Sequence, residues 1–427
     1  QHQREVFALY VFGQSVRFLR IDRCGIITAD VLNYVRNPRT LAEFFWRYSH
    51  LSPLQRGFDT TVVPATPAER RLLSVAVLES IRLADKSKSP PFPNIRNTLS
   101  KDYPSYKVEV VDETSEEKSW YIIRKPCFDL DLPFGRTTRG YVALKVDADE
   151  TKDGSSPPPD VLARKLVFFK DCWRHYEKGV WTETDMYQEL AEFGIPHTPH
   201  LIAGGDVFTE EHAQHSLMQN LFLVKGLKWL HVSRSLSMYV HHRLVQPLAF
   251  PLNTLRTAKE MVQVLRDALQ ALIDAYVKAR ILHRDISVNN ILVSPFLGKD
   301  KAGRGILNDW DIARKLEDSE FTLRLPRQGT WRFMSVALLG DQDKPHSIHD
   351  DLESVFWVLV YTAVHHFKHV GWVPLDLFDE ERIFYPLNED PVIKGGAYKS
   401  SFLVQNNVRF NCPAVDDLVH ALRDFWH

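Results

Sequence analysis

The chain has 427 residues, of which 44% are hydrophobic and 25% are charged, an ordinary globular composition that is long enough for two or three domains. Its formal net charge is -1, so it lacks the basic excess that contact with a nucleic acid or a membrane surface requires. We therefore expect neither a nucleic-acid partner nor a membrane partner.

The spacing of the cysteines limits which kinds of site and which cellular location are expected. All 4 lie far apart in the sequence and form no CxxC pair. This spacing argues against a disulfide framework and against a four-cysteine zinc site. Free thiols in a reducing compartment are the default, so we expect an intracellular location, in the cytoplasm or nucleus. The longest apolar run, Val355–Tyr361, is far too short to span a membrane and predicts a buried helix.

The first part of the chain alternates between strand and helix patterns. Three strands are predicted at its start, at Val6–Phe12, Val16–Ile21 and Ile26–Ala29. Three helices are predicted after them, at Val31–Arg36, Leu41–Tyr48 and Glu69–Ala84. Ser87–Pro93, which contains three prolines, ends this pattern as a loop. Residues 1–115 are therefore interpreted as an α+β extension.

The pattern changes after residue 115. Strands are predicted at Trp120–Arg124, at Gly135–Lys145 after a glycine-containing turn, and at Lys165–Lys170. The polar stretch Thr151–Asp160 is predicted to be a surface loop, and Thr182–Phe193 a helix. Long helices follow at Lys259–Arg280 and Asp350–His366. This order predicts a small β-rich lobe over 116–247, followed by a larger helical lobe over 248–427.

The stretch His283–Asn290 carries the strongest chemical signal. It fits the kinase catalytic loop, H-R-D-x-x-x-x-N, and it stands between a long amphipathic helix and the apolar strand Ile291–Val293. Phosphoryl transfer from a nucleotide needs a carboxylate that orients the acceptor hydroxyl and oxygen ligands for Mg²⁺. Asp285 is the candidate base, Asn290 a candidate metal ligand, and Arg284 belongs to the same motif. The alternative is a surface loop without catalytic function.

A second candidate metal ligand, Asp309, lies shortly downstream. It opens Asp309-Trp310-Asp311, where the metal-binding D-F-G segment of a kinase belongs. Asp309 keeps the carboxylate, and its alternative role is that of a solvated turn residue. Trp310 keeps the aromatic character of the phenylalanine. Asp311 replaces the glycine, which reduces the freedom of the backbone. Asp311 is either a turn residue or a second polar contributor to the site.

A glycine-containing turn lies upstream of these residues. Gly135–Val142 fits G-x-G-x-x-G-x-V, except that Thr137 replaces the middle glycine. A loop of this kind covers the phosphates of the nucleotide, so the candidate ATP-binding residues are Gly135, Thr137, Gly140 and Val142. A plain hairpin turn is the alternative interpretation.

Two lysines compete for the role of gripping the phosphates. Lys145 lies only five residues after Gly140, on the strand that leaves the turn, whereas the lysine is expected on the next strand. Lys170 is on that next strand, so we prefer it; its alternative is a strand-end lysine that reaches to solvent. The partner of this lysine is expected on the following helix. Glu183 is preferred to Glu189 there, although Glu183 also suits an exposed first-turn position.

Gly329–Ala337 lies where a kinase activation segment ends. Ser-Val-Ala stands there in place of the usual Ala-Pro-Glu, so the glutamate that normally forms a salt bridge with a later arginine is absent. Asp351 opens the apolar helix that follows. An aspartate at this position would brace the backbone of the catalytic loop, or it would be a simple helix N-cap.

Together these motifs resemble the protein-kinase superfamily and, more closely, the fungal-type protein kinase family. The segments that carry the resemblance are Phe169–Arg174, Leu282–Ser287, Leu307–Ala313, Gly329–Ser335 and Asp350–Ser354. Glu183–Tyr187 is also similar to casein kinases of the first class. The resemblance covers Trp120 to the C-terminus and extends more loosely over the N-terminal part. It implies an α+β, bilobal protein-kinase-like fold with an N-terminal α+β extension, a hinge near Val245–Leu248, and ATP with Mg²⁺ between the lobes.

The resemblance implies an ATP-dependent protein kinase that acts on Ser/Thr hydroxyls of a protein substrate. Ser287 departs from the pattern, because serine/threonine kinases usually have a lysine there that contacts the transferred phosphate. A small-molecule phosphotransferase is therefore one alternative. A pseudokinase that binds partners without catalysis is another, motivated by Thr137, Asp311 and Ala337.

Overall fold

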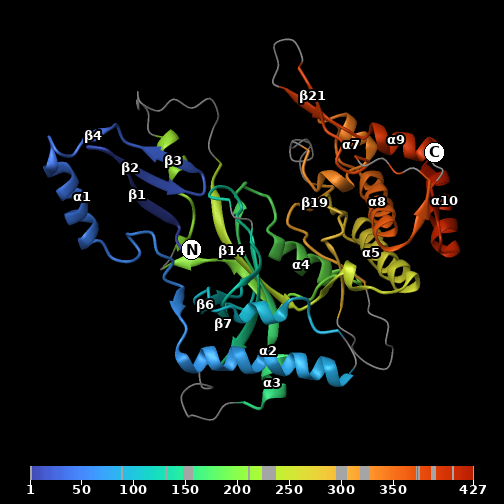
Figure 1. The fold of residues 1–427 in the computed structure, drawn as a ribbon, viewed down its shortest axis with the longest axis horizontal. Helices are drawn as coiled ribbons and strands as arrows, with labels where there is room; N and C mark the ends of the chain where they lie inside the picture. Colours follow the sequence, from blue (N-terminus) through green and yellow to red (C-terminus); the bar gives the residue numbers. More distant parts are fainter. Residues whose placement is uncertain are drawn as a thin grey trace. The chain divides into compact units, whose positions relative to one another are not determined.

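The computed structural model describes residues 2–87, 90–129, 132–147, 157–209, 212–223, 237–294, 305–317, 327–371, 373, 376–385, 391–405 and 408–426 (Figure 1). Its contacts divide the chain into two compact units. The first is Gln1–Val180 with Leu201–Leu248, and the second is Trp181–His200 with Ala249–His427. The first unit is rich in strands and the second is mainly helical. The chain passes into the second unit after Leu248, the last residue of the predicted hinge.

The first unit begins with a small antiparallel sheet. Its strands are β1 (Glu5–Phe12), β2 (Ser15–Asp22), β3 (Gly25–Thr28) and β4 (Leu32–Asn33), and β2 pairs with the other three. Helix α1 (Pro38–His50) follows with a proline in its first turn, where the missing N–H costs no helical hydrogen bond. The predicted three-stranded meander and the predicted helix at Leu41–Tyr48 are confirmed, with shifted ends.

The predicted helix Val31–Arg36 is wrong. Leu32 and Asn33 form β4, and a turn follows them. The side chain of Asn33 accepts hydrogen bonds from the backbone N–H groups of Val35 and Arg36, at 3.1 and 2.9 Å. An asparagine that satisfies the backbone groups just after itself favours a turn over a helix, which explains the difference.

An eight-stranded sheet forms the centre of the first unit. Its order is β11-β14-β10-β9-β7-β6-β5, and β8 pairs with β9. The strands are β5 (Val62–Pro64), β6 (Tyr106–Val111), β7 (Lys118–Ile123), β8 (Pro126–Asp129), β9 (Arg139–Val146), β10 (Leu166–His175), β11 (Ala203–Asp206) and β14 (Tyr239–Pro247). Strands β5 and β6 come from the predicted extension, yet they share this sheet with the strands of the predicted β-rich lobe.

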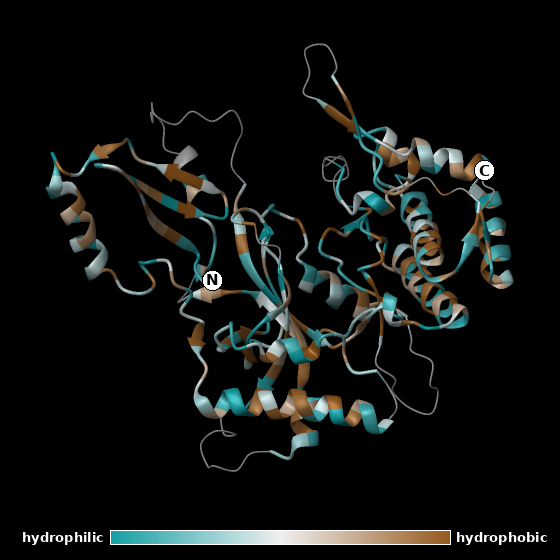
Figure 2. Ribbon diagram, viewed as in Figure 1, coloured by the Kyte–Doolittle hydropathy of each residue, from teal (hydrophilic) through white to brown (hydrophobic). Residues whose placement is uncertain are grey.

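Two apolar clusters pack against this sheet, whose strands carry much of the hydrophobic colour in Figure 2. One cluster joins α2 (Pro67–Ser87) and α3 (Pro159–Arg164) to β7 and β9 through residues such as Leu73, Leu162 and Leu144. Pro159 and Asp160 begin α3, so the predicted loop Thr151–Asp160 ends earlier than expected; residues 151–156 lie outside the described part. The second cluster contains Phe169 and Val245.

A buried ion network holds the N-terminal segment on this sheet. Arg243 of β14 is 1% exposed and donates to Asp59 Oδ2 at 2.6 Å and to Asp171 Oδ1 at 3.1 Å. His241 Nε2 lies 2.7 Å from the same oxygen of Asp171. Burial raises the pKa of both carboxyls, but the charges of Arg243 and His241 outweigh it and hold each pKa well below its usual range. The network therefore fixes Asp59 against the strand that carries Lys170.

The second unit is built mainly from helices, of which α5 and α8 are the longest described. They are α4 (Glu183–Glu192), α5 (Ala258–Lys278), α7 (Val336–Gly340), α8 (Ile348–His366), α9 (Ala397–Val404) and α10 (Pro413–Trp426). A capping box of Thr257 and Glu260 starts α5 and satisfies its first backbone N–H groups. The predicted helices that correspond to α4, α5 and α8 are confirmed. Among the described residues, no helix is both long and apolar enough to cross a membrane.

Short strands and 3₁₀ turns complete both units. In the first unit these are β12 (Phe208–Thr209), β13 (His212–Ala213), η1 (Ile95–Leu99) and η2 (Met218–Leu223). In the second unit they are β15 (Phe250–Pro251), η3 (Leu252–Thr254), β16 (Ile281–Leu282), β17 (Ile291–Val293), β18 (Gly305–Leu307), β19 (Arg314–Lys315), η4 (Trp331–Phe333), β20 (His369–Val370), β21 (Arg382–Phe384), β22 (Val392–Lys394) and β23 (Arg409–Phe410). The hairpin of β17 and β18 separates the two segments that carry the candidate metal ligands.

Arg243→Met tests the buried network. The change should lower the free energy of unfolding by about 3–5 kcal/mol, because it leaves two carboxylates buried without their cation. Urea titration followed by circular dichroism measures the loss, with Arg36→Met, at an exposed arginine, as the matched control. Equal stability of Arg243→Met and Arg36→Met would contradict the assignment.

The stability that the network contributes should also depend on pH. Because Asp59 and Asp171 have lowered pKa values in the folded protein, their contribution to stability is present above the ordinary aspartate pKa of 3.8 and is lost as the pH falls below it.

Candidate active site

The side chain of Asp351, in the first turn of α8, holds the backbone of the loop His283–Asn290 in place. Asp351 is fully buried, and its two oxygens accept the backbone N–H groups of His283 and Arg284, each at 3.0 Å. Ser347 and Asp350 form the capping box of this helix, so Asp351 is not needed as its cap. The predicted bracing role of Asp351 is confirmed by these hydrogen bonds.

Two residues of the site hold a backbone conformation that is unfavourable for side chains. The φ angle is 71° at Arg284 and 64° at Asp309. Such residues cost on the order of 1–3 kcal/mol each and gather at functional sites, where the surrounding contacts enforce them. For Arg284 the enforcing contact is Asp351. Burial and the nearby charge of Arg314 lower the pKa of Arg284 to about 10, while Asp351 opposes the change, so Arg284 stays a cation at neutral pH.

Asp285 and Asn290 are fixed in the same loop. Asp285 Oδ1 accepts two hydrogen bonds from Thr330, one from the backbone N–H and one from the hydroxyl, both at 2.7 Å. The amide nitrogen of Asn290 donates to the carbonyl oxygen of Asp285 at 2.8 Å. This bond uses the nitrogen of Asn290 and leaves its amide oxygen as the atom suited to a metal ion.

Asp309 follows β18 and is positioned by contacts on both sides. The backbone N–H of Asn308 donates to the carbonyl of Asn290 at 2.8 Å, which ties the two predicted metal-binding segments together. Tyr187 of α4 donates its hydroxyl to Asn308 Oδ1 at 2.8 Å and accepts the N–H of Asp309 at 3.0 Å. Sequence reasoning assigned no role to Tyr187, although the motif Glu183–Tyr187 ended on it. Trp310 is fully buried and packs edge-on against His283.

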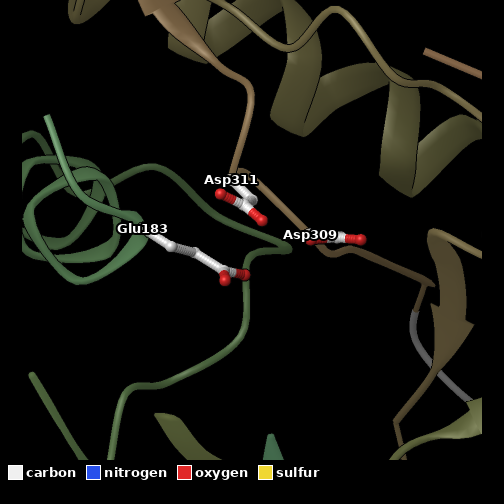
Figure 3. Close-up of side chains that lie close together, drawn as sticks. All are labelled: Glu183, Asp309 and Asp311. Atoms are coloured by element: carbon white, nitrogen blue, oxygen red, sulfur yellow. The ribbon is translucent and has the colours of Figure 1, made fainter. Parts of the chain in front are cut away.

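Three carboxylates gather at this point (Figure 3). Oxygen atoms of Glu183, Asp309 and Asp311 all lie within 4.8 Å of one another. Carboxylates this close repel one another unless a cation offsets their charge. Oxygen ligands are those that Mg²⁺ prefers, and the amide oxygen of Asn290 is of the same chemical type. The residues therefore fit a divalent cation. Of the two interpretations of Asp311, this cluster favours the polar contributor.

The backbone conformation at position 311 does not require the glycine that kinases usually have there. Asp311 is absent from the described residues that have positive φ angles, whereas Asp309 is among them. The expected loss of backbone freedom at Asp311 therefore carries no strain. Glu183 is 3% exposed and begins α4, where Thr182 and Asp185 form a capping box. Glu183 belongs to the second unit and Lys170 to the first, and their pairing stays a prediction.

The predicted nucleotide-binding residues lie in the turn before β9 (Gly135 and Thr137), on β9 (Gly140 and Val142) and on β10 (Lys170) of the first unit. Lys170 is 6% exposed and pairs in register with Gly140, whereas Lys145 pairs with Tyr121 of β7. Lys170 thus lies on β10, the strand after β9, whereas Lys145 lies on β9, which leaves the glycine turn. Because alternate residues of a strand face the same side, Val142 and Lys170 share one face of the sheet. Val142 is 1% exposed and belongs to the cluster that α2 covers.

The turn itself depends on its glycines. A Cβ atom on Gly140 would lie 2.1 Å from Cε1 of Phe128, so a side chain there would require the exposed ring of Phe128 to move. Gly135 has a φ angle of 78°. Thr137 has a φ angle of 38° and is 4% exposed, so the residue that replaces the middle glycine keeps a left-handed backbone. The loop retains its glycine-type shape at the position where the motif is broken.

The loop braced by Asp351, the candidate base at its centre and the carboxylates of Asp309 and Glu183 are the features of a kinase-like protein. Residues 1–363 match the fungal protein kinase family, and the chain belongs to this family. The predicted resemblance is thereby confirmed. The match begins at the N-terminal sheet and ends inside α8, so it includes all the candidate site residues. A search of the curated proteins finds no match.

Tyr187→Phe tests the contact that positions Asp309. Removal of the hydroxyl leaves the N–H of Asp309 and the side chain of Asn308 without this partner, which should lower the free energy of unfolding by about 1–3 kcal/mol. Tyr276→Phe on α5 is the matched control, because no hydrogen bond of its hydroxyl is lost. Urea denaturation measures both variants. A Tyr187→Phe protein as stable as the control would show that the hydroxyl does not hold this turn.

Proposed function

We propose that the chain is an ATP-dependent protein kinase that transfers the γ-phosphoryl group to Ser/Thr hydroxyls of a protein substrate. The observation that carries the proposal is the pair of 2.7 Å hydrogen bonds from Thr330 to Asp285 Oδ1. They engage one oxygen of Asp285, so the other can accept the proton of an acceptor hydroxyl. Thr330 is itself an alcohol held on this carboxylate, which supports an alcohol as the acceptor.

The other residues serve the nucleotide and its metal ion. Asn290 and Asp309 would hold Mg²⁺, and the cluster of Glu183 with Asp311 supports a cation at this point. When bound, Mg²⁺ offsets the negative charge of the β- and γ-phosphates. Lys170 would grip the phosphates and Glu183 would orient it. The turn Gly135–Val142 would cover the nucleotide.

The segment after Gly329 favours a protein substrate over a small molecule. Gly329 has a φ angle of 119°, and a Cβ atom there would lie 2.7 Å from the carbonyl oxygen of Arg284. The segment therefore runs directly against the catalytic loop and offers a polypeptide acceptor a surface beside Asp285. Ser287 is 1% exposed and supplies no cation to the transferred phosphate, so we expect slower turnover than a lysine would give.

The departures that motivate a pseudokinase have local explanations. Thr137 keeps the left-handed backbone of the glycine that it replaces. Asp311 adds a carboxylate to the cluster that suits a cation. These features support an active enzyme.

We place the activity inside the cell, in the cytoplasm or nucleus, because all four cysteines are free thiols. We expect neither nucleic acid nor a membrane as partner.

Asp285→Ala should reduce transfer of labelled phosphate from ATP by about 10²–10⁴-fold, because it removes the group that accepts the proton of the acceptor. Protein, peptide and small-alcohol acceptors are compared, and phosphoamino-acid analysis identifies the modified residue. Asp343→Ala, at an exposed aspartate, is the control. Full activity of Asp285→Ala would refute the assignment of the base, and transfer to small alcohols alone would favour a small-molecule phosphotransferase.

Asp309→Asn should abolish the part of nucleotide stabilisation that depends on Mg²⁺. A ligand that binds the folded state raises the melting temperature, so an ATP analogue with Mg²⁺ should stabilise the wild type more than the analogue alone. The variant should respond equally with and without Mg²⁺, and Asp343→Asn should behave as the wild type. If no nucleotide shifts the melting temperature of the wild type, the protein is a scaffold rather than a kinase.

A further inference from the structure

A fully buried lysine of α9 contacts Met334, near the end of the segment whose Thr330 donates hydrogen bonds to the proposed base, Asp285. Lys399 of α9 is 1% exposed. Its Nζ donates to the carbonyl oxygen of Met334 at 2.7 Å and lies 4.9 Å from the ring centroid of Trp357. Burial lowers the pKa of Lys399 to about 7, and the negative charge of Glu353 acts in the opposite direction. A lysine side chain is almost never fully buried unless its amine has a partner.

Glu353 of α8 holds the same segment from the other side. It is 9% exposed, and its Oε1 accepts the N–H of Val336 and the indole N–H of Trp357, both at 2.8 Å. Burial raises the pKa of Glu353, while these hydrogen bonds and the charge of Lys399 lower it. The carboxylate is thus satisfied by two donors, one of which belongs to the segment itself.

The two side chains hold backbone atoms on either side of Ser335. The hydroxyl of Ser335 donates to Asp350 Oδ1 at 2.6 Å. Each of the three residues from Met334 to Val336 is therefore fixed by a buried side chain of α8 or α9. The 3₁₀ turn Trp331–Phe333 connects them directly to Thr330, because the N–H of Phe333 donates to the carbonyl of Thr330 at 2.9 Å. Movement of Met334 would be transmitted to Thr330 through this single turn.

We propose that Glu353 and Lys399 are positioning residues that fix residues 329–336 against Asp285 and so shape the docking surface for a polypeptide acceptor. This inference rests on the proposed kinase function and names how its acceptor is selected. The sequence lacks the usual glutamate, because Ala337 occupies its position. The carboxylate of Glu353, from the following helix, and the ammonium of Lys399 hold the segment instead.

Lys399→Met tests the proposal with a side chain of similar length that cannot donate to Met334. Amide hydrogen exchange of residues 334–339 should accelerate by about tenfold or more, because local opening becomes easier when buried contacts are lost. Exchange at His283 and Arg284, which Asp351 holds, should stay unchanged. Lys259→Met, at an exposed lysine of α5, is the matched control and should exchange as the wild type.

Steady-state kinetics separate positioning from general structural damage. In Lys399→Met the KM for a protein acceptor should rise by about fivefold or more, while the KM for ATP and the hydrolysis of ATP without acceptor change less than twofold. Unchanged exchange together with an unchanged acceptor KM would overturn the proposal. A wild type that transfers no phosphate would refute the proposed function, whereas the exchange measurement would still decide whether Lys399 holds the segment.

The double variant Glu353→Gln/Lys399→Met provides a second test in case Lys399→Met alone does not fold. It removes both charges together, so no unpaired charge remains buried, and it should melt at a higher temperature than either single variant. Its glutamine keeps an oxygen that can accept the N–H of Val336, but the donor to Met334 is still lost. Accelerated exchange and a raised acceptor KM in the folded double variant would support the proposal, and wild-type values of both would overturn it.

Discussion

The candidate active site depends on the buried carboxylate of Asp351, which accepts the backbone N–H groups of His283 and Arg284. Arg284 has a left-handed backbone, a conformation that costs on the order of 1–3 kcal/mol and persists only where other contacts enforce it. Asp351 also satisfies two buried N–H groups that helix and sheet do not. With this loop fixed, Asp285 and Asn290 stand at defined places, and the backbone bond from Asn308 to Asn290 fixes Asp309 in turn.

A second constraint is electrostatic. The site concentrates the carboxylates of Glu183, Asp309 and Asp311, and a cation would offset their mutual repulsion. The capping box of α4 fixes the start of the helix that carries Glu183, and the hydroxyl of Tyr187 accepts the backbone N–H of Asp309. Oxygen atoms of this kind are the ligands that a hard divalent cation such as Mg²⁺ would prefer. The chemistry of the site therefore follows from rigid placement of charge, which matches what phosphoryl transfer requires of a protein.

Features encoded by neighbouring residues were predictable. The helices α5 and α8 were found from helical periodicity, and the candidate catalytic loop and the candidate metal ligand Asp309 were indicated by short motifs. The helix predicted at Val31–Arg36 failed because the side chain of Asn33 stabilises a turn. The ion pair of Arg243 with Asp59 joins residues 184 positions apart, and no local pattern indicates it. The roles of Tyr187 and Lys399 were missed for the same reason.

The sequence by itself determined the kinase-like family, because the residue types and spacings within His283–Asn290 and at Asp309 fit kinase motifs. It also determined which residues are missing from the usual pattern. Only the tertiary structure decided how those absences are met, through Glu353 and Lys399 at the end of the activation segment and the left-handed backbone at Thr137. The physical reason is that a motif specifies side chains close in sequence, whereas burial, charge compensation and hydrogen bonding act between groups brought together by folding.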